Sequence, residues 1–101
     1  MIYITQLIYI RSGKELVFEQ FESVALPLID KYNGKLLLRV RPGAEAFIAT
    51  NVDQPYEIHF VQFETDDDLA AFMQDEGRKK FLHLKEEAIS SVLLVKGQKI
   101  G

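Results

Sequence analysis

Hydrophobic residues in this chain fall into extended runs, separated by stretches with helical periodicity. The run from Ile2 to Ile10 is apolar at every position except Thr5 and Gln6. A run without regular polar alternation indicates a strand that is buried on both faces. Later runs predict strands at residues 35–41, 56–63 and 88–95, and a shorter run at 45–50 would add one more.

Two intervening stretches repeat apolar residues every three or four positions, which is the spacing of a helix with one buried face. The first begins after Ser12, whose hydroxyl can accept from the Glu15 amide in a capping box, and ends at Gly34. Pro27 lies inside this helix and cannot donate to the Ser23 carbonyl. The sequence therefore predicts a kink at Pro27.

The second helix begins after Thr65, whose hydroxyl makes it a good N-cap residue. Three aspartates at 66–68 fill the first turn, where the helix dipole favours negative charge. Gly77 is expected to break this helix, and residues 78–84 to add one or two further turns. The basic run 78–80 is expected to be a solvated helix end rather than an anion site.

The resulting order is strand, helix, strand, strand, helix, strand, which predicts an α+β fold of the ferredoxin-like class. Right-handed crossovers place both helices on one face of a four-stranded antiparallel sheet. The chain has 101 residues, so residues 1–101 are expected to form a single domain.

Both faces of this sheet are apolar, although the helices can cover only one of them. Tyr3 and Leu7 of the first strand and Phe60 of the third are expected to point away from the helices. A bare apolar sheet face of more than a few hundred Å2, on the order of 300–600, is rare on a soluble monomer. RNA, a second copy of the chain or a different protein could cover it.

RNA-recognition domains have this strand order, and two aromatic motifs of theirs fall on the first and third strands. In this chain the position that would stack a base holds Ile58, and Tyr56 and Glu57 replace a basic residue and a glycine. The net charge of −3 also argues against a partner that is a polyanion. Since isologous dimers are the commonest oligomers, a second copy is the favoured cover.

The composition of the chain excludes several kinds of chemistry and location. The chain has no cysteine, which removes disulfides, thiolate catalysis and cysteine-ligated metals. Residues Met1–Ile4 have no basic region ahead of them, and no apolar run approaches the ~20 residues that span a bilayer. These features predict a cytoplasmic protein that binds neither nucleic acid nor membrane.

Three stretches, at 24–39, 57–65 and 84–88, resemble a small, largely uncharacterised bacterial family of dimeric α+β barrels. Relatives in that superfamily include cofactor-free antibiotic-biosynthesis monooxygenases, lactone isomerases and haem-degrading enzymes. The resemblance implies a homodimer whose two sheets close a barrel, with a small pocket in each subunit between sheet and helices. The chain departs from these relatives at 75–78, where they usually have small residues, proline and tyrosine, and it has no tryptophan for a haem clamp.

Three polar residues are candidates for chemistry in such a pocket. His59 lies on the same side of its strand as Val61, and Gln6 on the same side as Ile4, so we expect the two to be neighbours if both face the helices. His59 could move a proton and Gln6 could orient a substrate carbonyl, or the two could simply satisfy one another in the core. The resemblance places an arginine where Arg39 stands, to hold a substrate carboxylate or, equally, to protect an edge strand.

The sequence therefore predicts a homodimer with a small-molecule pocket in each subunit. Its chemistry would be cofactor-free proton transfer or oxygenation of a small organic acid or aromatic. The alternative is a non-catalytic ligand-binding or protein-interaction module with the same fold. Convergence of the three candidate residues on an open pocket would favour the enzyme.

Overall fold

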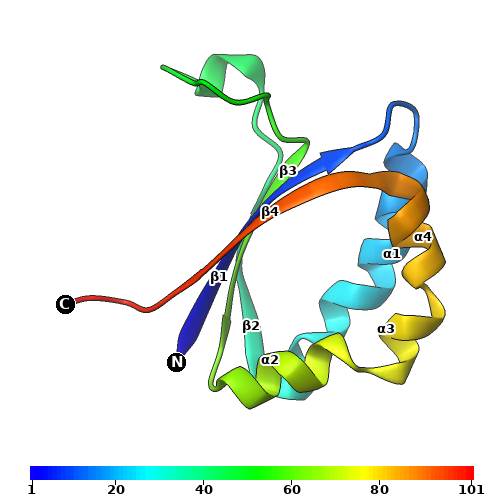
Figure 1. Cartoon of the computed structure of the whole chain (residues 1–101), viewed down its shortest axis with the longest axis vertical. Coiled ribbons are helices and arrows are strands. Elements are labelled where there is room, and N and C mark those ends of the chain that lie inside the picture. The colour runs from blue at the N-terminus through cyan, green and yellow to red at the C-terminus, as the bar shows by residue number, and fades with distance from the viewer.

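Four strands form one antiparallel sheet, and all the α-helices lie on the same side of it (Figure 1). The computed structural model describes all of residues 1–101. The strands are β1 (Ile2–Ile10), β2 (Gly34–Val40), β3 (Glu57–Phe63) and β4 (Ile89–Gly97), in the spatial order β2-β3-β1-β4. The helices are α1 (Glu15–Leu28), α2 (Asp66–Met73), α3 (Glu76–Lys80) and α4 (Leu82–Ala88). The predicted ferredoxin-like fold is confirmed, with three short helices in the second crossover.

Helix α1 begins without the predicted capping box. Its N-cap residue is Lys14, and no side chain accepts a bond from the first turn. Gly13 has a φ of +80°, which turns the chain between Ser12 and the helix. The Ser12 prediction was wrong because this left-handed residue delays the start of the helix.

Helix α1 was predicted to kink at Pro27 and to continue to Gly34, but the α-helix ends directly after Pro27. It ends at Leu28 and gives way to the short 3-10 helix η1 (Asp30–Tyr32). Asn33, with a φ of +58°, takes the left-handed position that the sequence had assigned to Gly34. A glycine is still needed at 34, since a Cβ there would lie 2.7 Å from side-chain atoms of Ile29 and Phe63.

Two other predictions about local structure were wrong. Residues 45–50 form no strand; the segment holds the short 3-10 helix η2 (Ala44–Ala46) and a loop in which Ile48 is fully exposed. The break after α2 comes before Gly77, which lies inside α3. It is Asp75 that starts the new helix, because its carboxylate accepts from the Arg78 amide at 2.9 Å. None of the helices has the length and apolar character needed to cross a membrane.

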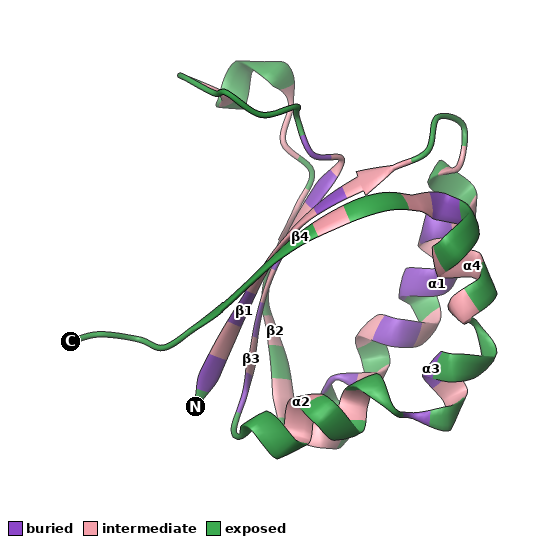
Figure 2. Cartoon of the chain, in the orientation of Figure 1, coloured by how far each residue is buried: buried purple, intermediate pink, exposed green.

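Burial is concentrated between the sheet and the helices (Figure 2). Alternate residues of β1 and β3 point into this layer, as the sequence pattern predicted. The opposite face of the sheet has no helix over it. On that face the rings of Tyr3 and Phe60 stack with their centroids 5.7 Å apart, and Leu38, Leu93 and Val95 remain 48%, 55% and 54% exposed.

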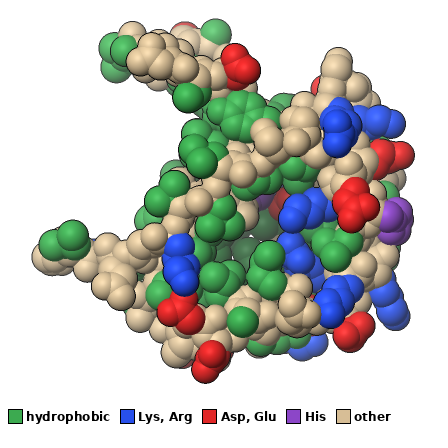
Figure 3. Space-filling model, in the orientation of Figure 1, with side chains coloured by type: hydrophobic (Ala, Val, Ile, Leu, Met, Phe, Trp, Pro, Cys, Tyr) green, Lys and Arg blue, Asp and Glu red, His purple; other side chains and the backbone are tan.

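Two segments project from the sheet on the side opposite the α-helices (Figure 1). One is the loop around η2, and the other is the C-terminal end of the chain beyond β4. The space-filling view shows a recess between them (Figure 3). Each projection carries an almost fully exposed isoleucine, Ile48 at 101% and Ile100 at 97%.

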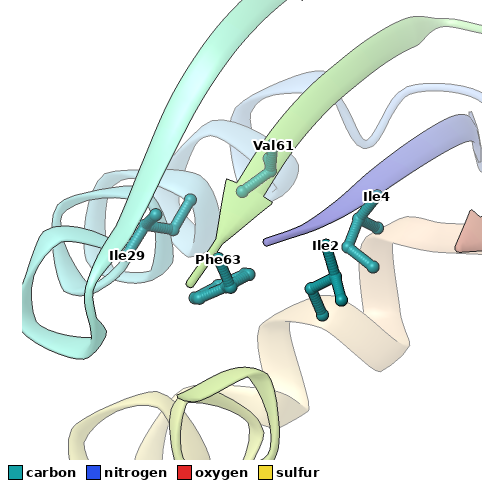
Figure 4. Packing of buried hydrophobic residues seen from close by; sticks show 5 residues of the cluster. All are labelled: Ile2, Ile4, Ile29, Val61 and Phe63. Atoms are coloured by element: carbon teal, nitrogen blue, oxygen red, sulfur yellow. The ribbon is translucent and has the colours of Figure 1, made fainter. Parts of the chain in front are cut away.

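The apolar core has two parts, one at each end of the sheet. Ile2 and Ile4 of β1, Val61 and Phe63 of β3, and Ile29 after α1 form the larger one (Figure 4). The smaller one, at the other end of β1, consists of Ile8, Phe18 and Ala88. Between these two parts the same face of the sheet carries polar residues, and there the packing opens.

Candidate functional site

A cavity of about 300 Å3 lies between the inner face of the sheet and the helices. Nineteen residues line it, and 14 of them are hydrophobic. The polar lining residues are Gln6, Glu22, His59, Arg78 and Lys85. In the space-filling view hydrophobic side chains line a hollow at this place, and basic side chains stand at its edge (Figure 3). An apolar cavity with a few convergent polar groups is the usual form of a small-molecule site.

The three residues singled out in the sequence form one row across the sheet. Gln6 of β1 and Arg39 of β2 both lie directly opposite His59 of β3. Residues opposite one another in an antiparallel pair point to the same face. The predicted approach of Gln6 to His59 is thus found, and both line the cavity.

Arg39 faces the helices only because β2 is irregular. The pairing of β2 with β3 shifts register between Leu36 and Leu38, which inserts Leu37 as an extra residue. A shift of one residue sends every following side chain to the other face, so without the bulge Arg39 would point to the open side. The arginine does not line the cavity.

Instead Arg39 belongs to a closed cluster of charges, which we call the paired cluster: Glu19, Arg39, Arg41 and Glu57. Arg39 Nε lies 2.5 Å from Glu57 Oε1, and its Nη2 lies 3.2 Å from Glu19 Oε1. Arg41 bonds to Glu19 and reaches Glu57 at 3.3 Å. Glu57 is only 2% exposed, and two arginines neutralise it. Burial raises the pKa of Glu19, but the hydrogen bonds and charges of the two arginines outweigh burial, so this pKa is lowered.

His59 lies between this cluster and the cavity. It is 3% exposed, and its Nε2 is 3.4 Å from Glu57 Oε2 without forming a hydrogen bond. Burial lowers the pKa of His59 below its ordinary 6.5, although the nearby Glu57 charge acts in the opposite direction. The imidazole is therefore neutral at neutral pH, with one buried nitrogen lacking a partner.

Sequence reasoning missed Glu22, which lines the cavity from α1 and is 6% exposed. Its carboxyl group makes no hydrogen bond and no ion pair, in contrast to Glu57. Burial is the main reason that its pKa rises to about 7; the charges of Glu57 and Glu19 add to the rise, while Arg39 and Arg78 oppose it. A signal was present, because Glu22 lies four residues after Phe18 and three before Ala25, on the buried face of the helix.

Arg78 and Lys85 line the cavity from α3 and α4. Arg78 is 7% exposed, so the prediction of a solvated helix end was wrong for this residue, while Lys79 and Lys80 are exposed as expected. The sequence does not reveal this difference because the break at Asp75 sets which side of the short helix faces inward.

Comparisons with known proteins bear on the fold alone. No family model matches the chain, and no curated protein matches it. A protein of unknown function from Rhodopseudomonas palustris has a similar structure, with a TM-score of 0.82 and 9% identity over 99% of this chain and 82% of that one. A NIPSNAP family protein of unknown function from Agrobacterium tumefaciens superposes with a TM-score of 0.69 and 16% identity over 96% of this chain and 86% of that one.

A dimeric protein of unknown function with a ferredoxin-like fold, from Bacteroides fragilis, is also similar. The TM-score is 0.70 at 13% identity, and the match covers 97% of this chain and 95% of the other. At such low identities these likenesses establish the ferredoxin-like fold of the chain and nothing about its chemistry.

Proposed function

We propose that this protein is a homodimer that binds a small organic molecule in the cavity of each subunit and carries out cofactor-free proton transfer on it. The observation that supports this best is the pair of titratable groups without a hydrogen bond, Glu22 and His59, on the wall of a largely apolar cavity. Buried groups that can exchange a proton near neutral pH and face a cavity are typical of acid–base sites.

In this proposal Glu22 is the proton acceptor and His59 a hydrogen-bonding group. A carboxyl with a pKa of about 7 can accept and return a proton at neutral pH, as a general base requires. The neutral His59 ring, beside Gln6, could orient a carbonyl or hydroxyl of the ligand. Arg39 enters as a positioning residue, because it neutralises the Glu57 carboxylate next to the ring. The resemblance to a family of dimeric α+β barrels, whose superfamily includes cofactor-free monooxygenases and lactone isomerases, is consistent with such chemistry.

The proposed dimer uses the open face of the sheet. This face carries the Tyr3–Phe60 stack together with Leu93 and Val95, a surface that water solvates poorly. A second copy is the occupant we favour, because the projections on this side, with exposed Ile48 and Ile100 on them, flank a recess that a second sheet could enter. The dimeric protein from Bacteroides fragilis, which has the same fold, gives independent support.

Ligand binding can be tested by a thermal-shift screen of small neutral and anionic aromatic and aliphatic compounds. A ligand that binds only the folded state raises the melting temperature. The variant Ala25→Leu adds volume to the cavity wall and should abolish the shift, whereas Ala71→Leu, on the exposed side of α2, should retain it. Equal shifts in both variants would mean that the compounds bind elsewhere.

Proton transfer can be tested with a ligand that has an acidic C–H bond. Incorporation of deuterium from D2O, followed by NMR, should be fast with the native protein and ~100-fold slower with Glu22→Gln. A protein that binds such ligands tightly but exchanges no proton would instead be the non-catalytic binding module.

The dimer can be tested by sedimentation at micromolar concentration. Leu93→Asp places a charge on the open face and, by two-fold symmetry, places it there twice, so it should give monomers. Leu16→Asp is a matched control, because Leu16 is 80% exposed on α1 and its replacement should leave the dimer intact. A native protein that sediments only as an 11.6 kDa species would rule out the dimer.

A further inference from the structure

Two cations on the cavity wall have no acidic partner. Neither Arg78 nor Lys85 comes within 4.0 Å of a carboxylate oxygen, although Arg39, Arg41, Lys14, Lys31 and Lys96 all do. The Nε of Arg78 is buried and makes no hydrogen bond, and only its Nη1 finds an acceptor, the Met73 carbonyl at 3.4 Å. Burying a guanidinium without an ion-pair partner costs free energy, so the position of Arg78 indicates that a group from outside the chain supplies the missing negative charge.

The position of Arg78 is built from several elements. Its guanidinium lies 5.8 Å from the ring centre of Phe21 on α1 and 5.3 Å from that of Phe72 on α2. Asp75 is close in sequence but does not neutralise it, because that carboxylate accepts from the Arg78 backbone amide and from the side chains of Tyr32 and Lys31. These bonds hold the pKa of Asp75 well below its usual range, and the Asp75 and Glu22 charges act on the Arg78 guanidinium only from a distance, without an ion pair.

The two cations lie where the cavity meets a second, more open hollow. Arg78, Lys85, Met73 and Ile89 line both spaces. A ligand entering from the hollow would pass the two cations before it reached the apolar interior. Burial lowers the pKa of Lys85 and the Arg78 charge adds to this effect, while the charges of Glu22 and Glu86 oppose it without forming an ion pair. Glu86 lines the open hollow together with Lys85.

We propose that the ligand is an apolar organic monoanion whose carboxylate lies between Arg78 and Lys85 and whose hydrocarbon or aryl body fills the cavity. The inference rests on the ligand-binding cavity proposed above and specifies the class of compound that enters it. An arginine in a poorly solvated site suits a carboxylate, since it offers parallel donors in a fixed plane. The volume of about 300 Å3 corresponds to roughly ten non-hydrogen atoms at ~30 Å3 each, the size of octanoate or phenylacetate.

Glu22 makes this anion site dependent on pH. The charged groups that face Glu22 are Arg39 and Arg78, which favour its ionised form, and Glu57 and Glu19, which oppose it; His59 and Lys85 line the same cavity. A bound carboxylate adds one more negative charge and so favours protonated Glu22. The affinity for the anion should therefore be constant at acidic pH and fall as pH rises above about 7, by at most ~10-fold per pH unit for one proton.

Octanoate and its uncharged analogue octanamide provide a test by isothermal titration calorimetry at pH 6.5. Octanoate should bind at least tenfold more tightly. Lys85→Met should weaken octanoate about tenfold, the loss of ~1.4 kcal/mol, and leave octanamide unchanged. Lys79→Met is the matched control, because Lys79 is an exposed lysine on the adjacent helix, and it should change neither affinity. Arg78→Met should have a larger effect on octanoate, provided that circular dichroism shows it folded.

The possible results of these titrations distinguish failure of the anion site from failure of the proposed function. Equal affinities for octanoate and octanamide, or equal losses in Lys85→Met and Lys79→Met, would overturn the anion site while leaving the cavity a binding site. Absence of binding by both compounds, together with a thermal-shift screen without hits, would overturn the anion site and the proposed function together. If the affinity of Glu22→Gln for octanoate still falls above pH 7, Glu22 is not the group that causes the pH dependence.

Discussion

Two groups of charged side chains lie on the same side of the same sheet and differ in how they are neutralised. In the paired cluster, Glu57 bonds to Arg39 and Arg41, and both arginines bond to Glu19 as well. Beside the cavity, Glu22, Arg78 and Lys85 lie in the same layer without any ion pair among them. The first group is complete within the chain, and the second is not.

The difference indicates what each group does. Ion pairs that satisfy one another position the strands they join, and they leave little for a ligand to gain. Charges that remain apart in a poorly solvated cavity keep their affinity for a proton or a counter-ion. The pKa values follow this division, since that of Glu19 is lowered and that of Glu22 is raised to about 7. Four substitutions can break or sharpen the comparison.

Glu57→Gln should have the largest effect. It leaves two arginines facing a neutral amide at a position that is 2% exposed in the native protein. Removing one partner of a fully buried pair costs about 3–5 kcal/mol, and because water reaches Arg39 and Arg41 we expect a loss at the lower end of this range in the free energy of unfolding. Urea denaturation at fixed protein concentration measures it, and a loss below ~1 kcal/mol would mean that Glu19 alone neutralises both arginines.

Glu22→Gln should act in the opposite direction, and only at high pH. The pKa of Glu22 is raised from 4.5 to about 7 in the folded state, so the folded protein binds more protons than the unfolded chain between these values. Stability is therefore highest below pH 4.5 and falls until about pH 7, by about 3 kcal/mol in total from this one group.

The amide cannot ionise, so Glu22→Gln should be more stable than the native protein at pH 8 and similar to it at pH 4.5. Urea denaturation across this range measures the difference, and Glu15→Gln, an exposed change in the same helix, is the control. If the two variants show the same dependence on pH as the native protein, Glu22 is ionised in the folded state and belongs with the paired charges.

Arg39→Lys should cost less, about 1–2 kcal/mol, because it keeps the charge but loses the fork of donors. Arg39 uses Nε toward Glu57 and Nη2 toward Glu19, and a single ammonium group cannot serve both positions as well. Chemical denaturation gives the loss, and Arg11→Lys, at an exposed position, should show none. Full stability in Arg39→Lys would show that charge alone holds the paired cluster.

Glu19→Gln should have the smallest effect. The Glu19 side chain is 42% exposed, so water competes for it and salt screens its charge. Pairs of this kind contribute below about 1 kcal/mol, and the loss should shrink further in 1 M NaCl. A loss as large as that of Glu57→Gln, unaffected by salt, would mean that the two glutamates act as one unit.

Local pattern alone determined much of this protein. The order of strands and helices, the ferredoxin-like fold and the apolar character of both sheet faces follow from side-chain periodicity, because alternation sets the face of each strand residue. The Gln6–His59 pair was predictable for the same reason, since both lie in regular strands that this fold makes neighbours. The cap at Thr65, which accepts from the Asp68 amide, needs only three residues of local sequence.

Only the tertiary structure decided the composition of the site. Arg39 reaches the inner face through a bulge, and Arg78 is buried because Asp75 starts a new helix beside it. Each of these depends on a shift of one residue or a fraction of a helical turn, which hydrophobic patterning does not resolve. Whether a buried charge finds a partner depends on residues distant in sequence, such as Arg39 and Glu57, and folding alone brings these together.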